Sequence, residues 1–162
     1  PWCVYVGTTA VVAYLQRNEL FVGHLGDSRL VLCHNGEAQR ITQDHKPTDP
    51  EEENYIKSHG GYVQDDRVGG TLAVSRALGD GFLGDVINRT PDVTSVSLDL
   101  TDSFFIIACD GVWDVLSDQE AVDIVAAETD PLQAAIRLRD AAFDNLSMDN
   151  ISVLVVYLNE HL

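Results

Sequence analysis

The pattern of apolar and polar positions in the first quarter of the chain predicts a group of short β-strands. Residues 8–15, 20–24 and 29–34 are rich in β-branched and other apolar side chains, which is typical of strands. Asn35-Gly36 follows the third run and is a strong hairpin signal, because both residues tolerate positive φ angles. A fourth strand is expected over residues 38–42, and the four strands together predict an antiparallel meander.

Three later segments carry the start signals of helices. Asp49-Pro50, followed by three glutamates, predicts a first helix that the pair Gly60-Gly61 ends. Ser117, with a glutamate three residues later, has the sequence of a capping box and predicts a second helix up to about residue 128. Asp130-Pro131 opens a third helix, which we expect to reach about residue 143.

The second half of the chain adds an irregular segment and three more strands. Residues 60–84 are glycine-rich and weakly periodic, so we expect an irregular surface segment with few buried contacts. Residues 93–98 alternate like a half-buried strand, whereas 104–109 and 151–157 are continuously apolar, like strands buried on both faces. This order of elements predicts an α+β fold: an antiparallel β-sandwich flanked by helices.

Length, charge and cysteine content narrow the class of protein. The 162 residues are expected to form a single domain over residues 1–162. The net charge of −16 argues against nucleic acid or an anionic membrane as partner, and it favours metal cations or basic protein substrates. No apolar run approaches the ~18 residues that a membrane span needs. Cys3, Cys33 and Cys109 form no CxxC pair, which favours a reducing, intracellular compartment.

Aspartates stand at the ends of the predicted core strands. Asp110 directly follows the run 104–109, Asp149 precedes the run 151–157, and Asp27 lies in the turn of the first hairpin. Two carboxylates ~4 Å apart repel by about 4 kcal/mol at an effective dielectric of ~20, so a cluster needs arginines or divalent cations. Because only ten residues are Lys or Arg, a hard metal ion with oxygen ligands is the simpler solution. Taken alone, each aspartate also fits a turn or cap residue.

Other chemistries have little support in the sequence. The five histidines show no zinc-like spacing with each other or with cysteine, and no dinucleotide-binding, Walker or GxSxG motif occurs. Cys109 ends a buried strand without a visible activating base, so we do not expect it to act as a nucleophile. Asp44, Asp65 and Asp66 are interpreted as turn or cap residues, and Trp113 as a core anchor.

Six short motifs occur in the order in which one enzyme family carries them. They are Gly7-Thr8-Thr9-Ala10, Gly26-Asp27-Ser28-Arg29, Thr42-Gln43-Asp44-His45-Lys46-Pro47, Leu72-Ala73-Val74-Ser75-Arg76-Ala77-Leu78-Gly79-Asp80, Cys109-Asp110-Gly111-Val112-Trp113-Asp114 and Asp149-Asn150. Each motif is weak alone, but together, over residues 7–157, they resemble the metal-dependent serine/threonine protein phosphatases of type 2C. The resemblance implies hydrolysis of phosphoserine and phosphothreonine in proteins by a metal-activated water.

The resemblance also implies a metal site and its ligands. Asp110 and Asp149 would be catalytic ligands of a core pair of Mg²⁺ or Mn²⁺ ions. Asp27 and Asp114 would join Asp110 in holding a third, weaker metal. An enzyme of this kind would act inside the cell, in the cytoplasm or nucleus.

Further residues are assigned by the same resemblance. Arg76 matches an arginine near the substrate entrance, and residues 45–71 match a flap that shapes substrate choice. Arg29 is expected to be structural and to pair with a nearby carboxylate.

The front part of the family's domain does not occur in this chain. Its acidic pair, its phosphate-binding arginine and its Asp-Gly-His-Gly-Gly motif are absent, and the chain begins at Pro1 with Met148 as its one methionine. We therefore expect an incomplete sandwich, a phosphatase fragment that is inactive alone and associates with the missing N-terminal segment or with itself. The alternative is a non-catalytic regulatory or binding module, a pseudophosphatase, on the same fold.

Overall fold

The computed structural model describes residues 5–158, whose contacts divide them into two compact units. Unit 1 comprises residues 5–12, 23–27 and 44–92, and unit 2 comprises residues 13–22, 28–43 and 93–158. The flap expected over residues 45–71 belongs entirely to unit 1. The single domain over residues 1–162 stays a prediction.

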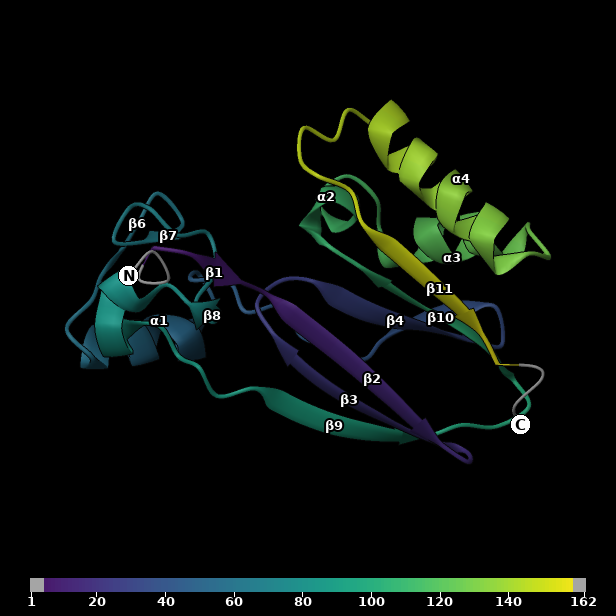
Figure 1. Cartoon of the computed structure of the whole chain (residues 1–162), viewed down its shortest axis with the longest axis horizontal. Coiled ribbons are helices and arrows are strands. Elements are labelled where there is room, and N and C mark those ends of the chain that lie inside the picture. The colour runs from purple at the N-terminus through teal and green to yellow at the C-terminus, as the bar shows by residue number, and fades with distance from the viewer. Residues whose placement is uncertain (1–4, 159–162) are drawn as a thin grey trace. The chain divides into compact units, whose positions relative to one another are not determined.

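Two β-sheets contain most of the strands (Figure 1). The four-stranded sheet has the order β11-β10-β4-β5 and consists of Val153–Tyr157, Asp102–Ala108, Arg29–His34 and Glu37–Arg40, all paired antiparallel. The three-stranded sheet has the order β2-β3-β9 and consists of Ala10–Gln16, Glu19–Leu25 and Asp92–Ser97. Together with the helices, these sheets confirm the predicted α+β fold.

The hairpin between β4 and β5 turns where the sequence predicts. Asn35 and Gly36 have φ angles of 52° and 82°, the positive values that a type I′ turn requires. The turn sets His34 opposite Glu37 and so fixes the register of the two strands. A slip by one residue would exchange the two faces of β5.

The three predicted helices begin at their predicted caps. They are α1 (Pro50–Ser58), α3 (Asp118–Ala126) and α4 (Pro131–Asp144). The side chains of Asp49, Ser117 and Asp130 each accept a backbone N–H of the first helical turn, which the helix cannot satisfy itself. A fourth, short helix, α2 (Asp110–Trp113), lies where the sequence analysis predicts no helix. None of the helices within residues 5–158 is long and apolar enough to cross a membrane.

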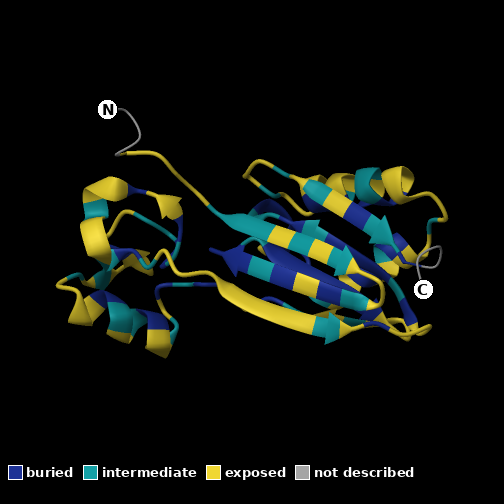
Figure 2. Ribbon diagram, turned by 60° about the horizontal axis from the view of Figure 1, so that its bottom comes forward, coloured by how far each residue is buried: buried dark blue, intermediate teal, exposed yellow. Residues whose placement is uncertain are grey.

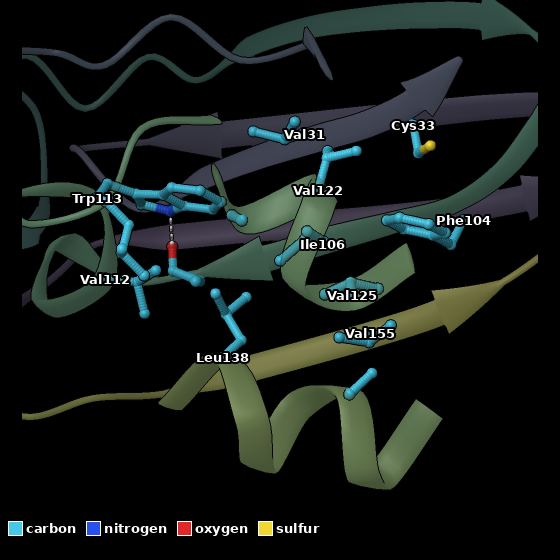
Figure 3. Packing of buried hydrophobic residues seen from close by; sticks show 14 of the residues in the cluster. Val31, Cys33, Phe104, Ile106, Val112, Trp113, Val122, Val125, Leu138 and Val155 are labelled. Carbon is cyan, nitrogen blue, oxygen red and sulfur yellow. Dashed lines mark hydrogen bonds between the residues drawn. The ribbon is translucent and has the colours of Figure 1, made fainter. Parts of the chain in front are cut away.

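Unit 2 has a continuous hydrophobic core between the four-stranded sheet and its helices (Figure 3). The sheet contributes Val31, Cys33, Phe104, Ile106 and Val155, and the helices contribute Val112, Trp113, Val122, Val125 and Leu138. Leu30 and Leu32 alternate with these residues along β4 and are also fully buried, so β4 is covered on both faces. Burial of one such side chain stabilises the fold by about 1.5–3 kcal/mol.

The glycine-rich segment of unit 1 has a small core of its own. Val68, Val74 and Ala77 are 1%, 8% and 1% exposed, and they pack with Ile56 of α1 and with Ile87. Most residues of 60–84 are exposed or half-buried, as expected, but the sequence did not predict this small core. The apolar residues follow no single period because they lie on short, irregular pieces of chain.

These pieces include short paired strands and a 3₁₀ helix. The strands are β1 (Gly7–Thr8), β6 (Val63–Gln64), β7 (Arg67–Val68) and β8 (Leu78–Gly79), and the 3₁₀ helix is η2 (Gly81–Val86). β6 and β7 form a hairpin, and β1 pairs with β8. Asp65 and Asp66 turn the hairpin with φ angles of 52° and 59°, which confirms that both are turn residues.

Strand β9 is more exposed than its alternating sequence predicts. Val93 is 73% exposed, and within the strand only Val96 is partly buried (Figure 2). Leu98, directly after the strand, is buried. The difference arises because β9 lies at an edge of its sheet, where the neighbour on one side is absent among the described strands.

Candidate metal centre

Asp110 and Asp114 are one helical turn apart at the end of β10. The strand ends at Ala108, and α2 begins at Asp110 after a single residue. The backbone N–H of Asp114 donates to the carbonyl of Asp110 at 2.9 Å, so the two side chains lie on the same face of the helix. Asp110 is half-buried and Asp114 is exposed. The strand-to-helix change thus presents two carboxylates at one end of the sheet.

Asp149 lies beside this segment because β10 and β11 are neighbours. Ala108 is paired with Val153, so the residues before β11 run next to those after β10. The approach is close: a Cβ atom on Gly111 would lie 2.3 Å from the carbonyl oxygen of Asn150. Asp149 itself is exposed, and its Oδ1 accepts the N–H of Asn150 at 2.7 Å. The fold therefore brings together two acidic segments that are far apart in the sequence.

The helix that carries Asp110 is anchored by Trp113. Its indole N–H donates to the carbonyl of Ala108 at 2.8 Å (dashed in Figure 3), and the residue is 7% exposed. The guanidinium of Arg29 lies 5.0 Å from the centre of that ring and pairs with Asp118 at 2.5 Å. Burial alone would raise the pKa of Asp118, but the pairing with Arg40 and Arg29 outweighs it, so this pKa is lowered. The expected roles of Trp113 as anchor and Arg29 as a structural residue are confirmed.

Asp27 belongs to unit 1 and is 3% exposed. It follows Gly26, whose φ of 93° favours glycine at this turn. Its Oδ2 forms an ion pair with the Lys46 ammonium, within the same unit. The buried charge of Asp27 is therefore balanced by a lysine, and its role as a ligand of a third metal, with Asp110 and Asp114, stays a prediction.

Arg76 is held by carboxylates of its own unit. Its guanidinium contacts Glu52 at 2.5 Å and Asp92 at 2.8 Å, and it donates to the carbonyl of Thr90 at 3.1 Å. Burial disfavours the charged form, but the contacts with Glu52 and Asp92 outweigh it, so the pKa of Arg76 is raised. These contacts give Arg76 a structural role in unit 1, and its contact with substrate stays a prediction.

The sequence does not predict two groups of histidine and aspartate side chains that the fold brings together. His24, His45 and Asp92 in unit 1, and His34, Asp99 and Asp102 in unit 2, each offer three ligand atoms within 4.8 Å of one another. Within each group the members are between 3 and 68 residues apart, without a repeating spacing, so no local motif could reveal them. Each group has hydrogen bonds that explain its geometry without an ion, such as the 3.0 Å contact between His34 Nδ1 and Asp102.

The sequence and the fold both match known proteins. The family Protein phosphatase 2C matches residues 2–151. A protein phosphatase 2C homolog of Schizosaccharomyces pombe is 43% identical, with 96% of this chain and 47% of that protein covered. A homolog of Saccharomyces cerevisiae is 42% identical, with coverage of 88% and 51%. The fold resembles the serine-threonine phosphatase 2C of Toxoplasma gondii, with a TM-score of 0.83, 30% identity, and 94% and 58% of the two chains covered.

The fold is an antiparallel α+β phosphatase fold, with carboxylates just after β10 and just before its neighbour β11. The chain belongs to the protein phosphatase 2C family. This confirms the resemblance found in the six motifs. The chain spans about half the length of the curated relatives that it matches. Phosphatase activity is a property of those longer relatives, and for this chain it is a proposal.

Proposed function

We propose that this chain is part of a metal-dependent phosphoprotein phosphatase that hydrolyses phosphoserine and phosphothreonine. The observation that carries the proposal is the pairing of β10 with β11, which brings the segments of Asp110 and Asp149 to the same end of the sheet. Asp114 adds a carboxylate one helical turn from Asp110. No cysteine or serine nucleophile is needed for this reaction.

The donor set fits Mg²⁺ or Mn²⁺. The side chains of Asp110, Asp114 and Asp149 offer carboxylate oxygens only, on residues that are half-buried or exposed, and hard divalent cations prefer oxygen ligands. Metal ions held by these carboxylates would lower the pKa of bound water and neutralise phosphoryl charge. Asp110 and Asp149 would hold the core pair, and Asp27 with Asp114 would contribute to a third position.

The chain alone is proposed to be inactive and to need a partner segment. The family's general-acid histidine motif and its phosphate-binding arginine do not occur in the sequence. The edge strand β2 exposes Val12 and Tyr14 at 64% and 58%, which supports addition of a further strand from the remainder of a phosphatase domain or from a second copy. The free thiols of Cys33 and Cys109 support an intracellular location, and the net charge of −16 favours basic phosphoproteins as substrates.

Phosphatase assays with and without the upstream segment test this function. The purified chain should hydrolyse neither a phosphothreonine peptide nor an aryl phosphate with Mn²⁺. A protein that includes the segment upstream of Pro1 should hydrolyse both, and its rate should fall when Mn²⁺ is chelated. In that longer protein, Asp110→Asn should remove most of the activity and leave the fold intact, since it relieves charge repulsion.

The matched control is Asp123→Asn, which changes a carboxylate on α3. It should leave the rate of the longer protein unchanged. Full metal-dependent activity of the purified chain as a monomer would contradict the proposed location of the active site. Unchanged activity of the longer protein with Asp110→Asn would contradict the ligand role of Asp110.

A further inference from the structure

The two acidic segments at the end of the sheet are tied together by side chains that are not acidic. Cys109 and Gly111 flank Asp110, while Ser147 and Asn150 lie on either side of Asp149. Two hydrogen bonds join these two sets, one from the Cys109 thiol to Asn150 and one from the Ser147 hydroxyl to Gly111, and the backbone of Gly111 closely approaches Asn150. We call the four residues Cys109, Gly111, Ser147 and Asn150 the clamp.

We infer that Cys109 and Ser147 are positioning residues that fix the separation of Asp110 and Asp149 and thereby set the affinity for the divalent metal. The inference rests on the proposed function, because it assumes that these two aspartates are ligands. It adds two residues that touch neither metal nor substrate. They act through the backbone on which the aspartates stand.

The Cys109 thiol replaces a backbone group of the sheet. The N–H of Cys109 donates to the carbonyl of Ser152 at 3.3 Å and so extends the ladder by one bond beyond Ala108. The carbonyl of Cys109 turns into α2 and accepts the N–H of Val112 at 3.0 Å, so it points away from Ser152. The thiol sulfur accepts the N–H of Ser152 at 3.2 Å instead. At the same time the thiol donates to the carbonyl of Asn150 at 3.1 Å.

This double contact explains why a thiol stands at the junction of strand and helix. A residue without a side-chain acceptor would leave the Ser152 N–H without this partner, just as the chain begins to enter β11. A sulfur atom reaches further than a hydroxyl oxygen, and it can donate and accept at once. The Cys109 side chain therefore fixes the backbone on both sides of Ile151, directly after Asp149-Asn150.

Ser147 makes the second tie, on the other side of Asp149. Its hydroxyl donates to the carbonyl of Gly111 at 2.6 Å, and its backbone N–H donates to the carbonyl of Ala142, where α4 ends. One side chain thus joins the end of α4 to the helix that carries Asp110. The missing Cβ of Gly111 allows the approach, because a Cβ there would lie 2.3 Å from the Asn150 carbonyl oxygen.

The clamp matters for metal binding because the two aspartates carry like charges. Without a cation, their repulsion favours a wider separation of the segments. Contacts that hold them in place before the metal arrives reduce the ordering that binding must achieve. Outer contacts that orient metal ligands change metal affinity 10- to 100-fold when they are removed. We expect about tenfold weaker binding for each tie that is lost.

Titration of the chain with Mn²⁺, followed by the electron paramagnetic resonance signal of the free ion, tests the inference. Cys109→Ala and Ser147→Ala should each raise the dissociation constant about tenfold. Cys109→Ser should restore only part of the affinity, because a hydroxyl can also donate and accept but reaches less far than the thiol. Asp110→Asn should abolish high-affinity binding.

Two control variants separate positioning from general stability. Cys33→Ala removes a thiol that is 2% exposed in the core, and Ser117→Ala removes the N-cap of α3. Both should lower the urea midpoint of unfolding without a change in the Mn²⁺ dissociation constant. Unchanged Mn²⁺ affinity in both Cys109→Ala and Ser147→Ala, with binding lost in Asp110→Asn, would overturn the inference and leave the proposed function intact.

A second measurement needs no metal. Amide hydrogen exchange of Ser152 should be faster in Cys109→Ala than in the unaltered chain, and equally slow in Cys33→Ala. Unchanged exchange of Ser152 would overturn the inference even if the chain bound no Mn²⁺. Mn²⁺ binding that does not depend on Asp110 would overturn the proposed metal site instead, so the two failures can be told apart.

Discussion

His45 contacts Gly26 through both its backbone and its ring. The N–H of His45 donates to the carbonyl of Gly26 at 3.0 Å, and its Nδ1 accepts the N–H of Gly26 at 3.0 Å. Because Nδ1 accepts, Nε2 carries the proton and donates to Asp92 at 3.2 Å. A neutral, buried imidazole therefore fixes the turn on which Asp27 stands.

The first prediction follows from the charge state of this ring. Burial lowers the pKa of His45 and outweighs the opposing contact with Asp92, while Arg76 and His24 lower it further. The unfolded chain then binds more protons than the folded one, so His45 stabilises the fold above a pH of about 6.5. This contribution is lost as the pH falls through the lowered pKa.

Urea unfolding at several pH values measures this contribution. His45→Ala should destabilise the chain by about 2 kcal/mol at neutral pH. It should also reduce the loss of stability between pH 7.5 and 5.5. His45→Asn keeps an acceptor near the position of Nδ1 and should be milder, but it should show the same reduced pH dependence. An unaltered pH dependence in both variants would exclude His45 as its source.

The contribution of His34 in unit 2 to stability should depend on pH in the opposite direction. Its hydrogen bond with Asp102 raises the pKa of the imidazole, and Asp99 and Glu37 add smaller effects in the same direction. The contact stabilises the fold below the ordinary histidine pKa, and the stabilisation is lost as the pH rises through the raised value. Nuclear magnetic resonance titration should show a lower pKa of His34 in Asp102→Asn, and a smaller decrease in Asp99→Asn. Equal pKa values in all three proteins would contradict the pairing.

The sequence predicted regular elements well where local signals fix them. The turn Asn35-Gly36 and the cap residues Ser117 and Asp130 act on neighbouring residues, so their effects can be read from a few positions. The small core around Val68 and Ile87 was missed because its members come from pieces of chain with different geometry. Burial of this kind depends on tertiary contacts, which no single period records.

The location of the candidate metal centre was also partly predictable from the sequence. Asp110 and Asp149 stood out because each borders an apolar run, and the pairing of β10 with β11 makes their segments neighbours. The contacts of His45 with Gly26 and Asp92 were not predictable, because they join residues 19 and 47 positions apart. The specific roles of Asp110 and Asp149 as metal ligands came from the family resemblance and not from the spacing of residues.

Arg76 offers a test that separates a structural role from a substrate role. Glu52 is 5% exposed, and replacement of Arg76 leaves its carboxylate with the hydroxyl of Ser75 as donor among the contacts described. Arg76→Met should therefore destabilise the chain by about 3 kcal/mol, since one partner of a buried ion pair is lost. The double variant Arg76→Met with Glu52→Met should recover part of this loss. A fully stable Arg76→Met chain would leave substrate binding as the explanation for this arginine.

Gly111→Ala is the most direct test of how closely α2 approaches the segment before β11. In most helices this change is favourable by about 1 kcal/mol, because alanine has the higher helix propensity. Here the added Cβ would lie 2.3 Å from the Asn150 carbonyl oxygen, a backbone atom that cannot rotate away. The helix or the strand must shift, and we expect a net destabilisation of about 2 kcal/mol in urea unfolding.

The matched control for this variant is Gly36→Ala. A Cβ at Gly36 would meet nothing within 4 Å, but its φ of 82° is strained for alanine, at a cost of about 1 kcal/mol. The Gly111 variant thus tests steric crowding, whereas the Gly36 variant tests backbone strain alone. The Gly111→Ala variant should also change the amide chemical shifts of Asn150 and Ile151, whereas Gly36→Ala should leave them unchanged. A Gly111→Ala chain more stable than the parent, with unshifted amides, would show that the two acidic segments do not pack against each other.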